Sequence, residues 1–412
     1  MGGRVLKTAK SQASIAIVGG GLVGLTLAIS LTERDYRVIL VDQHLKRTLG
    51  PSDTRSLALS FSSVEFLKTL ADGQVWARLE PFVTPIEHLH VSEAGTASLI
   101  RFHANDYGEF AFGYTVPITH VHRVLSERVE SLEVNVQSSK QVSAVEAESG
   151  RLIFSDGQSL EAPLILACDG GNSFIRTFLG LKTDRHDYHQ SALVTSLTLR
   201  DSHGNWAFER FLPEGVLAVL PLASTGKTHT VGVVWVQSQE KTEAAMALAD
   251  TSLLAMLQEA FGQRLGRFLQ IGPRHTYPLE KIIAKTTFAG RVLLMGNSAH
   301  QLNPVGAQGW NLALRDIATL LTLLDQSKKF PMDSIETLFN TYQKARSEDH
   351  AKIEQLTHGM AMWYGSDDLF SVIGRRSVMR ALRYSLRLRE HFVSTFMGKQ
   401  AYFAIQEIAD GR

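Results

Sequence analysis

The N-terminal part of the chain alternates short apolar runs with a glycine-rich turn. An apolar run at 15–18 precedes the glycine spacing G-x-G-x-x-G at 19–24, an apolar stretch at 25–31 and a second apolar run at 36–41 that ends in Asp42. Uninterrupted apolar runs of this length are typical of buried parallel strands. The pattern predicts a strand, a tight turn, a helix and a second strand, in that order.

Two later segments, 164–176 and 291–321, repeat the order of buried strand, polar turn and helix. Between them, apolar and polar positions alternate over short stretches, which predicts half-buried antiparallel strands. After about residue 330 the chain reads as helical. The expected strands cover 193–199, 206–211, 216–222 and 229–236.

Each glycine of the first turn has a mechanical reason. Gly19 permits the tight turn, Gly21 lets a pyrophosphate approach the backbone, and Gly24 allows the helix to pack closely on the strand. The helix N-terminus then offers unpaired N–H groups to the phosphates. Asp42 lies where an acid that binds the adenosine ribose belongs. The unit therefore predicts dinucleotide binding, with FAD and NAD both open at this point.

Composition excludes several classes of protein. The chain has 42 Lys and Arg against 41 Asp and Glu, a net charge of +1, so we expect no nucleic-acid partner. The single cysteine, Cys168, excludes an intrachain disulfide and is expected to be a small core residue of a cytoplasmic protein. Residues 11–32 carry no charge, but their central glycines argue against a signal peptide or a membrane span.

Three motifs in fixed order resemble the single-component FAD-dependent aromatic hydroxylases. They are the glycine turn at 19–24, the Asp-Gly pair at 169–170, and the segment from the Gly-Asn pair at 296–297 to Asn311. The resemblance runs over almost the whole chain, from about 15 to 397. Other segments are similar to the ubiquinone-biosynthesis hydroxylases of this family: 53–60, 112–114, 207–211 and 277–279.

Asn297 departs from the pattern of the wider family, which mostly has aspartate there. The amide offers one acceptor oxygen and two N–H donors, but it loses the charge-assisted hydrogen bond to a ribityl hydroxyl. The same asparagine occurs in the branch that acts on 2-polyprenyl-6-methoxyphenol. This branch is the one that the chain resembles most.

The resemblance implies an activity, its cofactor and its co-substrate. FAD would be reduced by NAD(P)H, react with O₂ to a C4a-hydroperoxide, and pass one oxygen atom to the ring of a polyprenylated phenol in ubiquinone biosynthesis. The cofactor carries the difficult chemistry, so the protein has to place it, exclude water and hold the phenol nearby. We accordingly expect no nucleophile array and no metal site.

The resemblance also implies which residues bind the cofactor. Arg55 is expected at the phosphate or flavin side, Arg123 at the flavin, and Asp169 beside both FAD and NAD(P)H. The full expected set is Gly19, Gly21, Leu22, Val23, Gly24, Asp42, Arg55, Arg123, Asp169, Gly170, Asn297, Pro304, Gly309 and Asn311.

No residue is assigned a catalytic role. His300 and Gln308 are the candidates, although a histidine beside such a turn is more often a hydrogen-bonded structural element. Glu209 and Arg210 are interpreted as a charged pair of a sheet, with substrate contact as the alternative.

These expectations define an α/β fold in which a Rossmann-type FAD-binding domain is interleaved with an antiparallel-sheet substrate domain and followed by a helical C-terminal region. The FAD-binding domain is expected to be discontinuous, because its motifs lie far apart. Its expected parts are 1–85, 111–185 and 283–345, the substrate domain takes 86–110 and 186–282, and the C-terminal region takes 346–412.

The C-terminal region hides a basic segment. Residues 374–391 hold six arginines and one acid, and four of the arginines follow a 4-3-4 spacing that puts them on one face of a single helix. A basic amphipathic helix suits an anionic membrane surface or an acidic partner in a ubiquinone-biosynthesis complex. A solvated arginine face on an ordinary packed helix is the alternative. If the basic helix binds an anionic membrane surface, the protein lies peripherally at the inner membrane.

Two other functions share these motifs. A flavin-dependent halogenase or polyprenyl reductase has the same FAD motifs, but the halogenase sequence Trp-x-Trp-x-Ile-Pro is missing and the expected antiparallel sheet argues against a reductase. A non-catalytic flavoprotein held in a biosynthetic complex is the third hypothesis, which Asn297 and the basic segment support.

Overall fold

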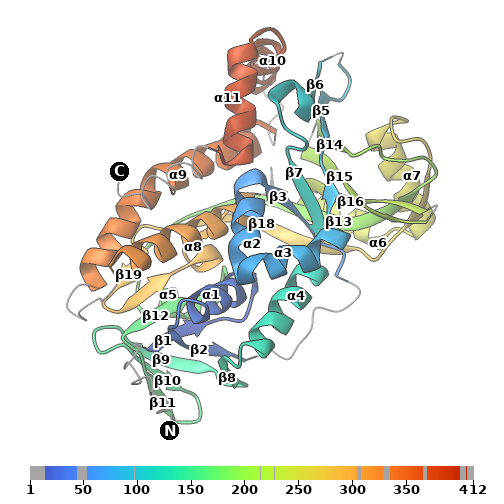
Figure 1. Ribbon diagram of the computed structural model, residues 1–412. Helices are drawn as coiled ribbons and strands as arrows, with labels where there is room; N and C mark the ends of the chain where they lie inside the picture. The colour runs from blue at the N-terminus through green and yellow to red at the C-terminus, as the bar shows by residue number, and fades with distance from the viewer. Residues whose placement is uncertain are drawn as a thin grey trace.

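The structure is a computed structural model of the 412-residue chain. It describes residues 14–43, 53–96, 98–213, 215–226, 228–303, 308–327, 335–364, 369–399 and 405. Two large sheets lie side by side, and the C-terminal helices run along them and end above the second one (Figure 1). This arrangement confirms the expected α/β fold class with a helical C-terminal region.

The first sheet has six strands in the order β19-β20-β12-β1-β2-β8, and all neighbours are parallel except β19 and β20. Neighbouring positions of each strand point to opposite faces of the sheet. Ile15 and Ile17 pack under helices, whereas Ala16 and Val18 face a small three-stranded sheet. The strands are β1 (Ser14–Val18), β2 (Arg37–Asp42), β8 (Asn135–Ser138), β12 (Leu164–Ala167), β19 (Phe288–Ala289) and β20 (Val292–Leu294).

Helices cover one face of this sheet, and the small sheet covers the other. The helical face carries α1 (Leu22–Thr32), α2 (Phe61–Thr69), α3 (Gln74–Leu79), α4 (Ile118–Ser131) and α8 (Gln308–Gln326). The opposite face carries β9 (Val142–Glu146), β10 (Arg151–Phe154), β11 (Ser159–Glu161) and α5 (Phe174–Phe178).

The second sheet is antiparallel apart from one parallel pair, β14 with β5. Its order is β21-β18-β13-β16-β15-β14-β5-β6, and β17 pairs with β13. The four strands expected between the motifs lie within β13 to β16, and β13 extends well beyond the expected stretch. The strands are β5 (His88–Glu93), β6 (Leu99–His103), β13 (Thr183–Leu199), β14 (Trp206–Leu212), β15 (Gly215–Thr225), β16 (Thr228–Ser238), β17 (Phe268–Ile271), β18 (His275–Ala284) and β21 (His300–Gln301).

One face of the second sheet is covered by α6 (Gln239–Ala247) and α7 (Asp250–Phe261), which bury a separate core around Leu197, Val233 and Leu257. A separate three-stranded sheet, in the order β3-β7-β4, connects the second sheet to the first half of the molecule. Its strands are β3 (Ser56–Ser60), β4 (Thr84–Pro85) and β7 (Gly113–Pro117), and short 3₁₀ turns cover Leu70–Gly73, Glu80–Phe82, Ala104–Tyr107 and Gly296–Ser298.

The C-terminal helices are α9 (Ile335–Tyr364), α10 (Leu369–Tyr384) and α11 (Leu386–Met397). Figure 1 shows α10 and α11 beside β5 and β6, where Met379 and Val393 pack on Phe102. The expectation of one basic helix over 374–391 is wrong. The chain is extended at Ser385, whose hydroxyl accepts a hydrogen bond from the amide of Leu388 and so caps a new helix.

This break changes the arrangement of the arginines. Arg387 lies on α11, so it does not share a helical face with Arg376, Arg380 and Arg383 of α10. Arg376 pairs with Glu93 of β5 at 3.3 Å. The expected domain boundaries stay a prediction. Within the described ranges, no helix is long and apolar enough to cross a membrane.

Candidate active site

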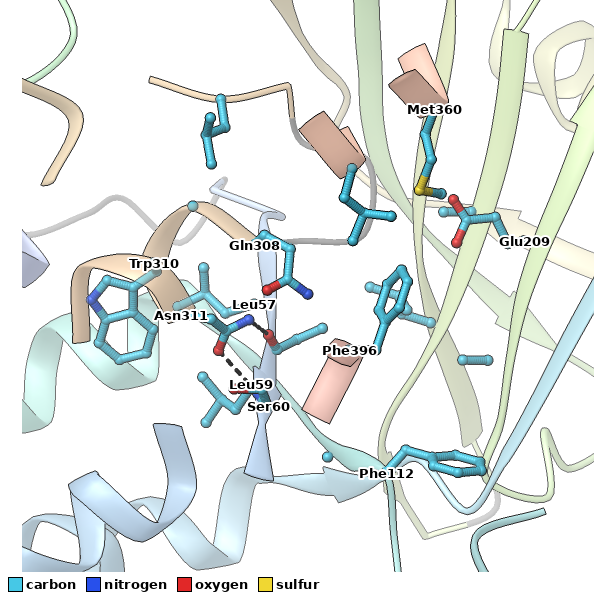
Figure 2. A pocket seen from close by; sticks show the side chains of 18 of the residues that line it. Leu57, Leu59, Ser60, Phe112, Glu209, Gln308, Trp310, Asn311, Met360 and Phe396 are labelled. Atoms are coloured by element: carbon cyan, nitrogen blue, oxygen red, sulfur yellow. Dashed lines mark hydrogen bonds between the residues drawn. The ribbon is translucent and has the colours of Figure 1, made fainter. Parts of the chain in front are cut away.

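A cavity of about 1100 Å³ lies between the two sheets. At one end it is bordered by the glycine turn after β1 and by the start of α8, and at the other by the second sheet, α10 and α11. Figure 2 shows Gln308 and Asn311 on one side of this space and Glu209 with Met360 on the other. Single-ligand pockets span about 300–1,000 Å³, so the volume suffices for a cofactor together with part of a substrate.

The glycine turn has the geometry that the spacing predicts. Gly19 has φ +109°, and a Cβ on it would lie 2.3 Å from the carbonyl oxygen of Cys168. A Cβ on Gly24 would lie 1.8 Å from the carbonyl oxygen of Gly19, so α1 packs against the turn without room for a side chain. A Cβ on Gly21 would meet nothing within 4 Å, and Gly21 borders the cavity.

The first turn of α1 presents its amide groups to the cavity. No side chain of the described residues caps this helix, and its first backbone hydrogen bond runs from the amide of Leu25 to the carbonyl of Gly21. Leu22 and Val23 border the cavity. Such a helix start favours an anion. Asp42 lies just outside the cavity lining, where its carboxylate accepts a 2.5 Å hydrogen bond from the amide of Gly20.

A second helix start, that of α8, borders the same cavity. A Cβ on Gly309 would meet nothing within 4 Å, so a ligand has direct access to this backbone. Asn311 also lines the cavity, but its side chain is engaged by the protein. It accepts hydrogen bonds from the amide of Ser60 (2.9 Å) and the hydroxyl of Ser63 (2.6 Å), and donates one to the carbonyl of Ala58 (2.9 Å).

Asn297 and Gly170 border the cavity from the ends of the first sheet's strands. Asn297 is exposed toward this space, and its amide makes no hydrogen bond to the residues that the structure describes. Gly170 has φ +86° with open space at its Cβ position. Both positions therefore leave polar backbone or side-chain groups available to a ligand.

Arg55 lines the cavity next to an acid and an aromatic ring. Its guanidinium donates hydrogen bonds to both carboxylate oxygens of Asp53, the shortest at 2.6 Å, and lies over the ring of Tyr277 at 5.4 Å. Burial acts against the Asp53 carboxylate, but the Arg55 hydrogen bonds lower the pKa of Asp53 below its usual value. The pair holds the guanidinium in one orientation at the cavity edge.

Six of the expected residues do not line the cavity: Gly19, Gly24, Asp42, Arg123, Asp169 and His300. The Asp169 carboxylate accepts hydrogen bonds from the Ser173 hydroxyl at 2.6 Å and the Ile175 amide at 3.1 Å, so it holds the start of α5. Arg123 is exposed on α4, with its guanidinium 5.3 Å from the Phe82 ring centroid. His300 is buried beside α8. Pro304 lies outside the described residues.

Sequence reasoning missed a buried charged cluster around Asp316 of α8. His300 lies 2.5 Å from one carboxylate oxygen, and Arg346 (2.6 Å) and His350 (2.7 Å) contact the other. Burial alone would raise the pKa of Asp316, but the positive charge at His350 and Arg346 holds it well below its usual value. The two histidines and the aspartate form a possible metal-ligand set, but the Arg346 guanidinium already occupies the carboxylate. His300 therefore has a structural hydrogen bond, and Gln308 is the candidate that lines the cavity.

Two further lining residues were not expected. Ile118 and His122 both border the cavity and lie one turn apart on α4. Because residues four positions apart share a face of a helix, this spacing would have predicted His122, and not Arg123, as a lining residue. Cys168, expected in the core, is half-buried at the cavity edge, and burial raises the pKa of its thiol.

As far as the described residues show, the far end of the cavity is apolar with one acidic side chain, Glu209 of β14. The interpretation of Glu209 and Arg210 as a charged pair is wrong, because neighbouring strand residues point to opposite faces. The Arg210 guanidinium donates a 2.8 Å hydrogen bond to the carbonyl of Ala260, behind the sheet.

The described residues fit a dinucleotide cofactor. Gly21 and Gly309 line the cavity with open space at their Cβ positions and so leave a cradle of exposed backbone, and the starts of α1 and α8 border it. These groups suit a pyrophosphate and a ring acceptor that gains negative charge on reduction. Bound there, FAD would supply the redox chemistry and the activation of O₂.

Comparisons with known proteins agree with this geometry. Ubiquinone hydroxylase UbiL of Rhodospirillum rubrum is 27% identical over 402 residues, covering 96% of this chain and 92% of that protein. The 3-demethoxyubiquinol 3-hydroxylase of Escherichia coli is 26% identical, with 85% and 88% covered. The crystal structure of a single-residue variant of Klebsiella pneumoniae HpxO complexed with FAD has a similar fold, with a TM-score of 0.74 at 15% identity over 94% of this chain and 100% of that one. The profile of the FAD binding domain family matches residues 12–357, and the chain belongs to this family.

Proposed function

We propose that the protein is an FAD-dependent, NAD(P)H-consuming monooxygenase that hydroxylates the ring of a polyprenylated phenol in ubiquinone biosynthesis. The observation that carries the proposal is the single cavity that joins a dinucleotide cradle to an apolar chamber. The named activities of the relatives from R. rubrum and E. coli support the ubiquinone pathway.

The division of the cavity supports an assignment of roles. FAD would bind along the glycine turn and the start of α8, with Arg55 and Asn297 beside it. The phenol ring would lie between this end and β14. The apolar walls of α10 and α11, which include Leu382 and Phe392, suit a hydrocarbon tail, because burying its surface contributes about 0.8 kcal/mol per CH₂.

The same two helices support contact with an anionic membrane surface. Leu386 and Tyr384 are each 74% exposed at the break between α10 and α11, and Val378 and Leu388 are exposed while also lining the cavity. Arg380 and Arg383 are exposed beside them. Apolar side chains flanked by arginines suit insertion at a lipid interface, and this position would let a tail enter the cavity directly from the bilayer.

Charge reversal tests the membrane proposal. The double substitution Arg380→Glu and Arg383→Glu should lower co-sedimentation with vesicles that contain anionic phosphatidylglycerol. An Arg200→Glu variant is the control, because Arg200 is an exposed arginine at the end of β13, away from these helices. Equal sedimentation of both variants and the unchanged protein would contradict the proposal.

Cofactor binding is tested at Gly21. Replacing it with valine should abolish flavin retention, because the new side chain projects into the cavity where the pyrophosphate would lie. Gly359→Val is the matched control, since Gly359 of α9 also has open space at its Cβ position but does not line the cavity. Flavin absorbance per protein is the readout, and full retention by the Gly21 variant would refute the assignment.

Activity is tested with the FAD-loaded protein, NAD(P)H, O₂ and a short-chain prenylated phenol. A hydroxylated product detected by mass spectrometry is the expected result. Flavin retention without NAD(P)H oxidation would favour the non-catalytic flavoprotein instead. The quinone intermediates that accumulate in a strain without this protein identify the ring position.

A further inference from the structure

Glu209 stands in the middle of the apolar wall of the cavity. Its cross-strand partners are Ala218 on β15 and Val91 on β5, and both of them also line the cavity. Ala207 and Phe211, two positions away along β14, line it as well. The period-2 alternation of the strand thus points the carboxylate into the cavity, toward the side that Gln308 and Asn311 occupy (Figure 2).

Among the residues that the structure describes, no group balances this carboxylate. It makes no hydrogen bond or ion pair to the residues that the structure describes, and its neighbours in Figure 2 include the thioether of Met360. Burial raises the pKa of Glu209 to about 7. An unpaired acid in an apolar wall destabilises the fold, and such groups are found mainly where chemistry needs them.

Several charged groups on the surrounding elements are engaged elsewhere. On the same sheet face Glu93 pairs with Arg376 of α10, at 3.3 Å. From α9, Glu354 pairs with Lys281 at 2.8 Å, and the ring of His358 accepts or donates a 2.9 Å hydrogen bond with the hydroxyl of Tyr188. Within the described ranges, the other ionisable side chains that line the cavity are Arg55, His122, Cys168 and His391.

We propose that the Glu209 carboxylate is the proton acceptor for the phenol hydroxyl of the substrate, an inference that rests on the proposed function. In the Michaelis complex the hydroxyl donates a hydrogen bond to the carboxylate. As the ring is oxygenated, the phenol O–H bond breaks, a carboxyl O–H bond forms on Glu209, and the released electron pair remains on the ring oxygen. The ring thereby becomes electron-rich when it needs to attack an electrophilic oxygen atom.

The acidities suit this role. A phenol has a pKa of about 10, so it stays protonated in an apolar cavity at neutral pH. A carboxyl group with a pKa near the working pH combines a large ionised fraction with useful basicity, which is the condition for efficient general-base catalysis. An ordinary surface glutamate is a weaker base by about two to three pKa units.

Binding gives the first test, with 2-allylphenol as an uncharged short-chain probe and the visible spectrum of the bound flavin as the readout. The FAD-loaded protein should bind the probe about tenfold more tightly at about pH 8 than at about pH 6, the ratio of the ionised fractions of an acid with a pKa of about 7. Glu209→Gln should bind with no such pH dependence. Glu280→Gln is the matched control, because Glu280 lies on β18 of the same sheet, paired with Arg185 and outside the cavity lining.

Turnover gives the second test. In Glu209→Gln the yield of hydroxylated product per NAD(P)H oxidised should fall by about 100-fold or more, the usual contribution of a general base, while flavin content is unchanged. Glu209→Asp, which keeps an acid, should retain a rise of activity with pH.

A Gln variant with the pH dependence and product yield of the unchanged protein would overturn the role of Glu209. If the unchanged FAD-loaded protein binds and hydroxylates no phenol at any pH, the proposed function itself fails and the inference fails with it. The two results differ in whether the unchanged protein forms product.

Discussion

The buried cluster around Asp316 should be a main determinant of stability, and Asp316→Asn is the substitution that tests it. Asp316 and Arg346 are 0% and 3% exposed, and their side chains meet at 2.6 Å between α8 and α9. Removing one partner of a buried pair leaves an uncompensated charge and costs about 3–5 kcal/mol. We expect a loss of this size in the free energy of unfolding, because the His300 and His350 contacts are weakened in the same step.

The pH dependence of this loss has a definite sign. The pKa of Asp316 is held well below its usual value of 3.8 in the folded protein, so its stabilising effect is complete above that unfolded value and is lost as the pH falls through the folded one. The difference between the unchanged protein and Asp316→Asn should therefore be constant from about pH 6 to 8 and shrink only in acid.

Urea unfolding followed by tryptophan fluorescence and circular dichroism measures the loss, and coincident transitions check that unfolding is two-state. Adding Arg346→Met to Asp316→Asn should recover most of it, because no unpaired charge then remains buried. Asp325→Asn is the milder control, since Asp325 pairs with Arg34 at 3.0 Å and its side chain is 52% exposed. A loss below about 1 kcal/mol for Asp316→Asn, or a double variant as unstable as the single one, would refute the reasoning.

Three further changes separate structural from functional roles. Gly24→Ala should lower the free energy of unfolding by at least about 2 kcal/mol, because its Cβ would lie 1.8 Å from the Gly19 carbonyl oxygen. Gly21→Ala should change the free energy of unfolding by less than about 0.5 kcal/mol, and thermal unfolding compares the two variants. Glu209→Gln should raise the free energy of unfolding by up to about 3 kcal/mol at pH 8 and hardly change it at pH 4, because the carboxyl has a pKa of about 7 in the folded protein instead of 4.5 and its ionisation disfavours the folded state. Unfolding at both pH values measures this difference, and a difference that does not depend on pH would count against it. Asn311→Ala should cost about 2–3 kcal/mol in urea unfolding, since three hydrogen bonds are lost, and an unchanged midpoint would contradict that.

The geometry of the glycine turn at one end of the cavity was predictable from the sequence because backbone sterics dictate it. Gly19 needs a positive φ and Gly24 needs a close approach, and no other residue satisfies either condition. The strands of the first sheet read as continuous apolar runs because both of their faces are buried. Side-chain roles were less predictable. Asp169 and Asn311 occupy positions in the family motifs, yet their side-chain polar atoms form hydrogen bonds within the protein that hold α5 and β3 in place.

The Asp316 cluster and the helix break show a second limit of sequence reasoning. Asp316 and Arg346 are separated by 30 residues and meet only because α8 and α9 pack together. No local sequence pattern predicts this contact. Ser385 stands between two stretches with good helical periodicity, so the 4-3-4 spacing of arginines continued across it without a visible interruption. Its side-chain cap on Leu388 identifies the break only once the structure is known.

The sequence of β14 could not predict which face of this strand borders the apolar end of the cavity, and the reason is physical. Both faces of this strand are mainly apolar, one with Ala207 and Phe211 and the other with Trp206 and Phe208, and each face carries one charged residue. Alternation therefore separates Glu209 from Arg210 but does not say which face borders a ligand. The packing of α7 decides it, because the Ala260 carbonyl accepts a hydrogen bond from the Arg210 side chain and so leaves Glu209 in the cavity. Since the described part of the chain provides a partner for the arginine and none for the acid, the acid is the member of the pair that a ligand has to satisfy.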